Sequence, residues 1–359
     1  MPCSGEQAVL AVVGTHLLSQ LVALAGGVFL VGLVLFLCHG AWSGAATRRN
    51  AARIAESQAE LQLALDEEGS HADHRRLAAL PRRLRIYVLA AVAPSLAGAH
   101  RQRLTALAAE LGVLAWADAK CRSHLWWRRL HGVRVCTLLG GGATSVPPLL
   151  GDRRPEVRAQ AAQWVVDHHE EQFIDLLLRR LDLDDDSSRF AVQDSLIRIG
   201  QPLLDRLALH LSVRSGPSLA PALEVAVALA DPVLLPAALS LCHEDAREIR
   251  ALAAELAGAI GGSAAVEVLV ELLEDDAPEV RAAAARALGR VQHWPSAAAL
   301  ARLLGDQSWD VRMQAAVALR SLGSPGILSL RRALSASDVF AADAARHMLD
   351  LPESAMRTL

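Results

Sequence analysis

The chain has few aromatic residues and almost no lysine. Of its 359 residues, 4% are Phe, Trp or Tyr, and Lys120 is the one lysine among 36 Lys and Arg. A core with so few rings has to be built from Ala, Leu and Val, which supply most of the 52% hydrophobic content. The formal net charge of −3 excludes a generally basic nucleic-acid binder. The positive mean hydropathy indicates a segment that meets lipid.

Motifs for catalysis, cofactor binding and metal binding are also missing. No P-loop, GxGxxG, HExxH or GxSxG motif occurs in the sequence. The five cysteines lie far apart without a CxxC pair, so the sequence indicates neither a disulfide framework nor a zinc ribbon. We therefore expect a protein that is not an enzyme, with no cofactor and no small-molecule substrate. The cysteines are Cys3, Cys38, Cys121, Cys136 and Cys242.

A long uncharged segment lies near the N-terminus. No Asp, Glu, Lys or Arg occurs between Glu6 and Arg48, and the most apolar part is 17–38. These 22 residues would form a helix of about 33 Å, which matches the roughly 30 Å apolar thickness of a bilayer. The segment predicts a single transmembrane span within an N-terminal anchor, residues 1–45. Arg48 and Arg49 follow at once, so the positive-inside rule predicts a single-pass inner or plasma membrane protein whose C-terminal part is cytoplasmic.

Cleavage of this segment as a signal peptide is the alternative. Small residues at 43–45 resemble a cleavage site, and the protein would then be exported. The apolar run is long for a signal peptide, and no Lys or Arg precedes it. Both features favour the membrane anchor.

Charge divides the rest of the chain into two parts. Residues 43–135 carry a net charge of +7 and residues 136–359 a net charge of −9. We interpret 46–124 as a basic helical stalk beside the membrane, where anionic headgroups attract basic side chains. Its apolar segment 80–99 is too short to span a bilayer, and both an interfacial position and packing on the following domain remain open. The negative charge of the C-terminal part argues against nucleic acid as a partner.

A period of 31 residues runs through 125–350. Arginines recur in phase, and in most units an acidic residue stands six positions before the arginine. Leucines precede the acidic residue, small residues follow the arginine, and a glycine often stands eleven positions after it. This pattern predicts two antiparallel helices per unit, stacked into an all-α solenoid of about seven repeats with a C-terminal tail, 351–359. The arginines in phase are Arg158, Arg189, Arg250, Arg281 and Arg312.

Three segments carry a resemblance to a known family. RRPEVRAQAA (153–162), DAPEVRAAAARALG (276–289) and QSWDVRMQAAVALRSLG (307–323) resemble HEAT repeats, in the short bacterial form that also occurs in phycobilin lyases. The resemblance implies a ladder of hydrogen bonds between Asp and Arg side chains of successive repeats. The unit near Leu219 has lost its arginine, so we expect the ladder to be interrupted there. The implied ladder residues are Asp152, Arg158, Arg250, Asp275, Arg281, Asp306 and Arg312.

The resemblance also implies a function. In HEAT solenoids the second helix of each repeat lines the concave face, which binds a protein partner. Here these helices are expected at about 170–182, 202–213, 232–243, 263–274 and 295–304. Their polar positions are the candidate partner-binding residues Arg179, Arg206, His210, Glu267, Glu271 and Arg302.

We therefore expect a membrane-anchored cytoplasmic scaffold for protein–protein interaction, whose partner could itself be a membrane protein. A phycobilin-lyase-like enzyme or chromophore-handling protein is one alternative that the repeat type leaves open. An exported HEAT-repeat protein is another, and a nucleic-acid-binding HEAT protein of the alkylpurine-glycosylase kind is a third.

Overall fold

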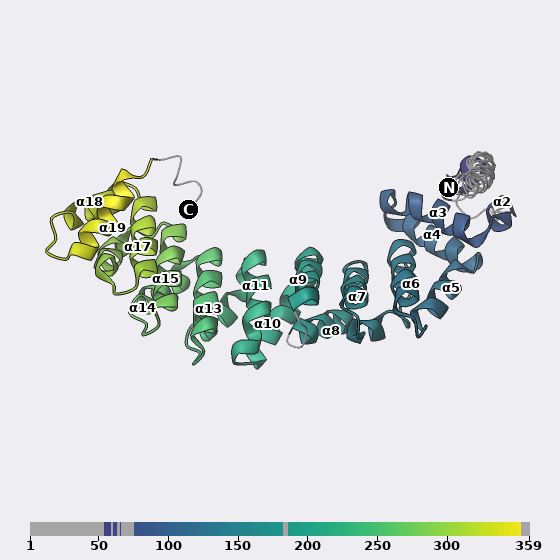
Figure 1. Cartoon of the computed structure of the whole chain (residues 1–359), viewed down its shortest axis with the longest axis horizontal. Helices are drawn as coiled ribbons and strands as arrows, with labels where there is room; N and C mark the ends of the chain where they lie inside the picture. Colours follow the sequence, from purple (N-terminus) through teal and green to yellow (C-terminus); the bar gives the residue numbers. More distant parts are fainter. Residues whose placement is uncertain (1–53, 59, 63–64, 66–74, 182–185, 353–359) are drawn as a thin grey trace, which may run out of the picture. The chain divides into compact units, whose positions relative to one another are not determined.

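The computed structural model describes residues 54–58, 60–62, 65, 75–181 and 186–352 (Figure 1). It divides the chain into two compact units, Met1–Val113 and Leu114–Leu359. The transmembrane span expected at 17–38 and most of the tail expected at 351–359 lie outside the described residues. Within the part that the structure describes, no helix is both long enough and apolar enough to cross a membrane. The secondary structure of this part is entirely helical, as the sequence predicts.

The first unit contains α2 (Arg75–Ala79), α3 (Arg82–Val92) and α4 (Gly98–Glu110), with a 3-10 turn, η1 (Ala93–Ser95), after α3. Helix α3 buries Val88 and Leu89 completely. Arg85 connects the segment before α3 to the residue after α4, because its Nε donates to the Leu80 carbonyl at 3.0 Å and its Nη1 to the Leu111 carbonyl at 2.8 Å. Segment 80–99 is only partly buried, since Tyr87 of α3 is 59% exposed.

The second unit is a stack of helix pairs (Figure 1). The first helices α7, α9, α11, α13 and α15 lie side by side in one row, and the second helices α8, α10 and α14 lie along the opposite edge of the unit (Figure 1). The first helices are α6 (Trp126–Leu139), α7 (Pro155–Asp167), α9 (Asp186–Ile199), α11 (Ala220–Leu229), α13 (Arg247–Ile260), α15 (Pro278–Val291), α17 (Trp309–Ser321) and α19 (Val339–Asp350). The second helices are α8 (Glu171–Leu181), α10 (Leu204–Val213), α12 (Leu235–Leu241), α14 (Ser263–Leu272), α16 (Ala297–Arg302) and α18 (Ser324–Ala333).

Several repeats of the second unit also contain a short 3-10 turn. In place of a second helix, η2 (Pro147–Gly151) follows α6. The other turns are η3 (Gln201–Leu203), η4 (Pro217–Leu219), η5 (Pro232–Leu234), η6 (Trp294–Ser296) and η7 (Leu303–Gly305).

The second unit begins earlier than the boundary at residue 125 expected from the repeats. Helix α5 (Val113–Cys121) packs against α6, because Gly132 lets the two backbones approach. A Cβ atom at Gly132 would lie 2.7 Å from the Ala117 carbonyl oxygen. The Asp118 carboxylate also accepts a hydrogen bond of 2.5 Å from Ser145, beyond α6. The sequence shows no repeat pattern in α5, so its membership of this unit depends on three-dimensional packing.

Alanine and glycine set the spacing between the first helices. A Cβ atom at Gly258 of α13 would lie 2.3 Å from the Ala287 Cβ of α15, and one at Gly289 would lie 2.7 Å from the Ala318 Cα of α17. The helices are therefore too close together for a larger side chain at either glycine. This close packing explains how the core is filled with so few aromatic rings. The largest fully buried side chain is Trp164 in α7, whose indole Nε1 donates to the Gly141 carbonyl at 2.6 Å.

Candidate functional site

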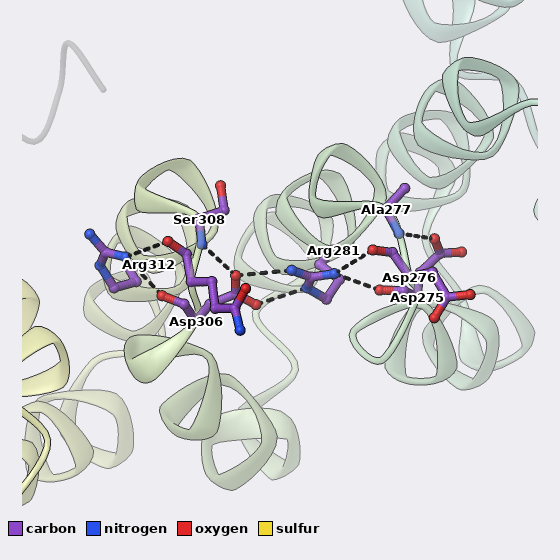
Figure 2. Close-up of polar contacts among 8 residues, drawn as sticks. Asp275, Asp276, Ala277, Arg281, Asp306, Ser308 and Arg312 are labelled. Atoms are coloured by element: carbon purple, nitrogen blue, oxygen red, sulfur yellow. Dashed lines mark hydrogen bonds and ion pairs between the residues drawn. The ribbon is translucent and has the colours of Figure 1, made fainter.

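The arginines in phase form a hydrogen-bonded ladder along the second unit. Arg281 donates from Nε and Nη2 to the two carboxylate oxygens of Asp306, at 2.8 and 2.9 Å (Figure 2). Its Nη1 donates in the other direction, to the carbonyl oxygens of Asp275 at 2.7 Å and Asp276 at 3.0 Å (Figure 2). Arg250 binds the Asp275 carboxylate in the same way, at 2.8 and 2.9 Å. Each arginine thus connects the turn before its own helix to the turn before the next first helix.

The aspartates of the ladder are mostly buried and held as carboxylates. The exposed fraction of the side chain is 8% for Asp306 and 11% for Asp275. Burial raises the pKa of Asp275, but the hydrogen bonds from Arg250 and from the Ala277 N–H, with the charges of Arg250 and Arg281, outweigh burial and lower its pKa below the usual range. The same balance, with Arg281 and the Ser308 N–H as donors, lowers the pKa of Asp306. The ladder is therefore a structural device with charges fixed at neutral pH.

The N-terminal part of the ladder differs from the expected pairs. Asp152 binds Arg129 of α6 at 2.6 and 2.8 Å, and Arg129 was not among the predicted ladder residues. Arg158 donates to the Ser188 hydroxyl at 3.2 and 2.8 Å and to the Asp152 carbonyl at 3.0 Å, and the position 25 residues after Arg158 lies outside the described residues. The signal for Arg129 lies in its spacing from Asp152, 23 residues instead of 25, because the short η2 replaces a full second helix.

A glutamine of α9 donates to a carboxylate of α11. Gln193 of α9 donates to the Glu224 carboxylate at 2.6 Å and to the Pro221 carbonyl at 3.2 Å. Helix α11 itself carries no arginine. The loss of the arginine that is visible in the sequence therefore coincides with a different side-chain contact between neighbouring first helices.

Three of the candidate partner-binding residues lie together in a groove between α8 and α10. The groove has a volume of about 240 Å³, and Arg179, Arg206 and His210 line it. Leu209 and Val213, which are 51% and 74% exposed, supply apolar surface beside them. The remaining lining residues are Asp175, Leu178 and Arg214.

The two arginine candidates of this groove, Arg206 and Arg179, differ in whether they form an ion pair with a described residue. The guanidinium of Arg206 binds both carboxylate oxygens of Asp175, one of them at 2.9 Å, and its side chain is 28% exposed. The hydrogen bond with Asp175 raises the pKa of Arg206. Arg179, by contrast, is exposed and makes no ion pair or hydrogen bond with any residue that the structure describes. Arg179 is therefore the arginine of the groove that can bind a partner without first breaking an internal contact.

The other candidates lie elsewhere on the second helices. Glu271 lines an acidic cleft at the end of α14, together with Glu274 and Asp276. Glu267 is exposed on the same helix. Arg302 of α16 forms an exposed ion pair with Glu274 at 3.1 Å. The six candidates thus occupy a mixed surface, basic at α8 and α10 and acidic at α14, and no group of three residues that could bind a metal ion occurs among the described residues.

Comparison with known proteins supports the repeat assignment. The family model described as HEAT repeats matches residues 271–349, which contain α15 to α18 and almost all of α19. No curated protein matches the chain.

Several solved structures match this chain over much of its length at low sequence identity. An engineered protein is 16% identical, with a TM-score of 0.36, and the match covers 84% of this chain and 95% of that one. A chain from the structure of Kap95p with RanGDP is 10% identical, with a TM-score of 0.44, and the match covers 82% of this chain and 49% of that one, so this chain spans about half its length. A chain of the CpcE–CpcF complex of phycocyanin lyase from Nostoc sp. PCC7120 is 17% identical, with a TM-score of 0.30 and coverage of 66% and 93%.

Proposed function

We propose that the chain is a membrane-anchored scaffold, without catalytic activity, that binds a protein partner on the exposed surface of its second helices. The carrying observation is the groove between α8 and α10. It combines Arg179, which makes no ion pair or hydrogen bond with any described residue, with exposed Leu209 and Val213. A basic side chain beside apolar surface is typical of a protein-binding patch, where the apolar contact supplies free energy and the charge supplies selectivity.

The construction of the second unit supports this function. Its apolar side chains are used in packing between neighbouring helices, so the surface that a partner meets is made of polar positions and a few exposed apolar ones. A stack of repeats exposes such positions at regular intervals over a long surface. The HEAT-repeat match at 271–349 agrees with this organisation.

The membrane anchor is the second part of the proposal and depends on the sequence of 17–38. We propose one span, with the N-terminus outside and the solenoid in the cytoplasm, because arginines follow the apolar run and none precedes it. Alkaline phosphatase and green fluorescent protein fused to the C-terminus test this orientation. We expect a fluorescent second fusion and an inactive first one. The opposite pattern, or an intact mass that begins near residue 45, would replace the anchor with export.

Partner binding is tested with charge reversal at positions that make no ion pair with the residues that the structure describes. In the variant Arg179→Glu, Glu267→Lys and Glu271→Lys, all three side chains are exposed in the native protein. We expect capture of the partner by crosslinking in membranes to fall, while the melting temperature and the membrane fraction stay unchanged. A second variant reverses three exposed basic residues outside the second helices, Arg83, Arg122 and Arg128, and locates the binding surface if the first variant has no effect. Capture that survives the first variant and is lost in the second would move the binding surface to the basic segment.

A further inference from the structure

Each regular step of the ladder pairs an arginine with the carboxylate of the next repeat, and Arg312 is the last arginine in phase. In the pairs of Arg250 and Arg281, the Nε and Nη2 edge of the guanidinium holds both oxygens of a carboxylate at 2.8–2.9 Å. Each of these aspartates also accepts the N–H of the residue two positions later, Ala277 or Ser308, at 2.8 Å. That residue is the N-cap of the following first helix. The carboxylate of the ladder therefore always lies two positions before an N-cap residue.

Arg312 makes the contacts to carbonyl oxygens but not the contact to a carboxylate of a described residue. Its Nη1 donates to the carbonyl oxygens of Asp306 at 2.8 Å and Gln307 at 3.0 Å, as in the preceding units (Figure 2). The next first helix is α19, with Asp338 as its N-cap, so the carboxylate position falls on Ala336. The Asp338 carboxylate itself accepts the N–H of Phe340 at 2.9 Å and caps the helix. Within the described part of the chain, the Nε and Nη2 edge of Arg312 binds no carboxylate.

Arg312 is one of the residues that line a pocket at this end of the ladder. The pocket has a volume of about 320 Å³ and is lined by α17 and α19. The Arg312 guanidinium lies over the Phe340 ring, 4.8 Å from its centroid. Trp309 and Phe340 are 66% and 59% exposed, which is unusual for large rings in a chain with so few of them. Asp343, on the same wall, forms an exposed ion pair with Arg346 at 2.6 Å.

We propose that this pocket binds an aspartate or glutamate side chain of a partner protein, so that the partner supplies the carboxylate missing from the last step of the ladder. The planar fork of arginine matches a carboxylate in two parallel hydrogen bonds, and here the contacts of Nη1 and the Phe340 ring already orient it. Trp309 and Phe340 give the residues next to that carboxylate an apolar surface to pack on.

A second copy of this chain does not fit as the occupant in a head-to-tail arrangement. The first arginine of the ladder, Arg129, donates from Nη1 to the carbonyl oxygens of Ser123 at 3.1 Å and His124 at 3.0 Å. The position that would carry a spare carboxylate at this end of the ladder is therefore a serine. The pocket is also separate from the groove between α8 and α10, so this proposal holds whether or not that groove binds a partner.

The probe is a peptide with the sequence of 303–308, LLGDQS, acetylated and amidated, which carries one carboxylate in the ladder context. Its matched control has Asn in place of Asp. Binding to the full-length protein is measured by NMR of the isotope-labelled peptide. We expect saturable binding of the Asp peptide in the millimolar range and at least about tenfold weaker binding of the Asn peptide. We expect Arg312→Met and Arg312→Lys to remove this preference, whereas Arg331→Met, at an exposed arginine of α18, leaves it intact.

A variant of the chain itself provides an independent readout. Ala336→Asp places a carboxylate two positions before the N-cap of α19, where Arg312 can bind it internally. We expect this variant to melt at a higher temperature than the native protein and to lose binding of the Asp peptide, and we expect Ala336→Asn to do neither. Equal binding of the Asp and Asn peptides, or the same binding in Arg312→Met, overturns the proposal. So does the absence of saturable binding up to about 10 mM, and tighter binding of a phosphoserine peptide would assign the pocket to phosphate instead.

Discussion

Replacing Arg281 by alanine removes one complete step of the ladder. The variant loses two hydrogen bonds to the Asp306 carboxylate and two to the carbonyl oxygens of Asp275 and Asp276. Asp306 keeps the N–H of Ser308 but remains a charged group with 8% of its side chain exposed. An unsatisfied buried polar group costs about 1–3 kcal/mol, and a broken buried ion pair about 3–5 kcal/mol. Since water reaches the edge of this pair, we expect a loss of about 3 kcal/mol in the free energy of unfolding.

Arg286→Ala is the matched control, on the same helix and with the same change in helix propensity. Arg286 pairs with Glu255 at 2.5 Å, but the side chains are 41% and 28% exposed. A pair at this exposure contributes less than about 1 kcal/mol. The two variants therefore remove the same residue type, and they differ in the burial of the ion pair and in the two hydrogen bonds that Arg281 donates to carbonyl oxygens.

The assay has to resolve local stability, because a stack of repeats need not unfold in one step. Urea unfolding followed by circular dichroism gives the overall free energy, and hydrogen exchange of the amides of α15 and α17 gives the local one. A double-mutant cycle with Asp306→Ala isolates the coupling of the pair. Equal costs for Arg281→Ala and Arg286→Ala, or a coupling near zero between Arg281 and Asp306, would refute the view that the ladder stabilises the stack.

Three further predictions concern the same unit. The pKa values of Asp152, Asp275 and Asp306 are lowered in the folded state, so the unfolded chain binds more protons in acid. The melting temperature should therefore be level above about pH 5 and fall below about pH 4. In Asp275→Asn it should fall less steeply than in the native protein. Gly258→Ala should lower the free energy of unfolding by about 1–3 kcal/mol although alanine favours helix, because its Cβ would meet Ala287, and gel filtration with chemical unfolding checks this. A chain that ends at His293 should keep the circular dichroism of the preceding pairs, because each unit packs only on its neighbours; complete loss of the helical signal would exclude the solenoid.

The helix positions could be predicted from the sequence because each unit repeats the same local signals. A proline at the first helical position marks the start of α7 and of α15. Glycines at 200, 261 and 323 mark where first helices end. All three glycines have φ between 66° and 77°, a backbone conformation that most other residues avoid. The second helices expected at 170–182 and 263–274 correspond to α8, Glu171–Leu181, and α14, Ser263–Leu272. The second helices expected at 232–243 and 295–304 are shorter in the structure, α12 Leu235–Leu241 and α16 Ala297–Arg302, because 3-10 turns occupy part of each segment.

The side-chain partners could be predicted only where the repeat is regular. Arg250 and Arg281 keep a spacing of 25 residues to their aspartates, whereas Arg129 reaches Asp152 over 23 because a short turn replaces the second helix. The pairing of Arg206 with Asp175 was not foreseen, since it joins two second helices across a full repeat. Which polar residues of a helix are free for a partner depends on such contacts, and they appear only once the helices are packed.

The ladder restricts where the chain can gain or lose residues. Between Asp275 and Arg281 lie the carboxylate that binds Arg250, the carbonyl that binds Arg281 and the N-cap of α15, so one inserted residue there would disturb two units at once. The turns between a first and a second helix, such as Gly261–Gly262, contain no ladder atom. Insertions are tolerated where few backbone contacts depend on loop length. Added segments would therefore emerge from one edge of the stack only, and the opposite edge would keep its repeat length as the protein diverges.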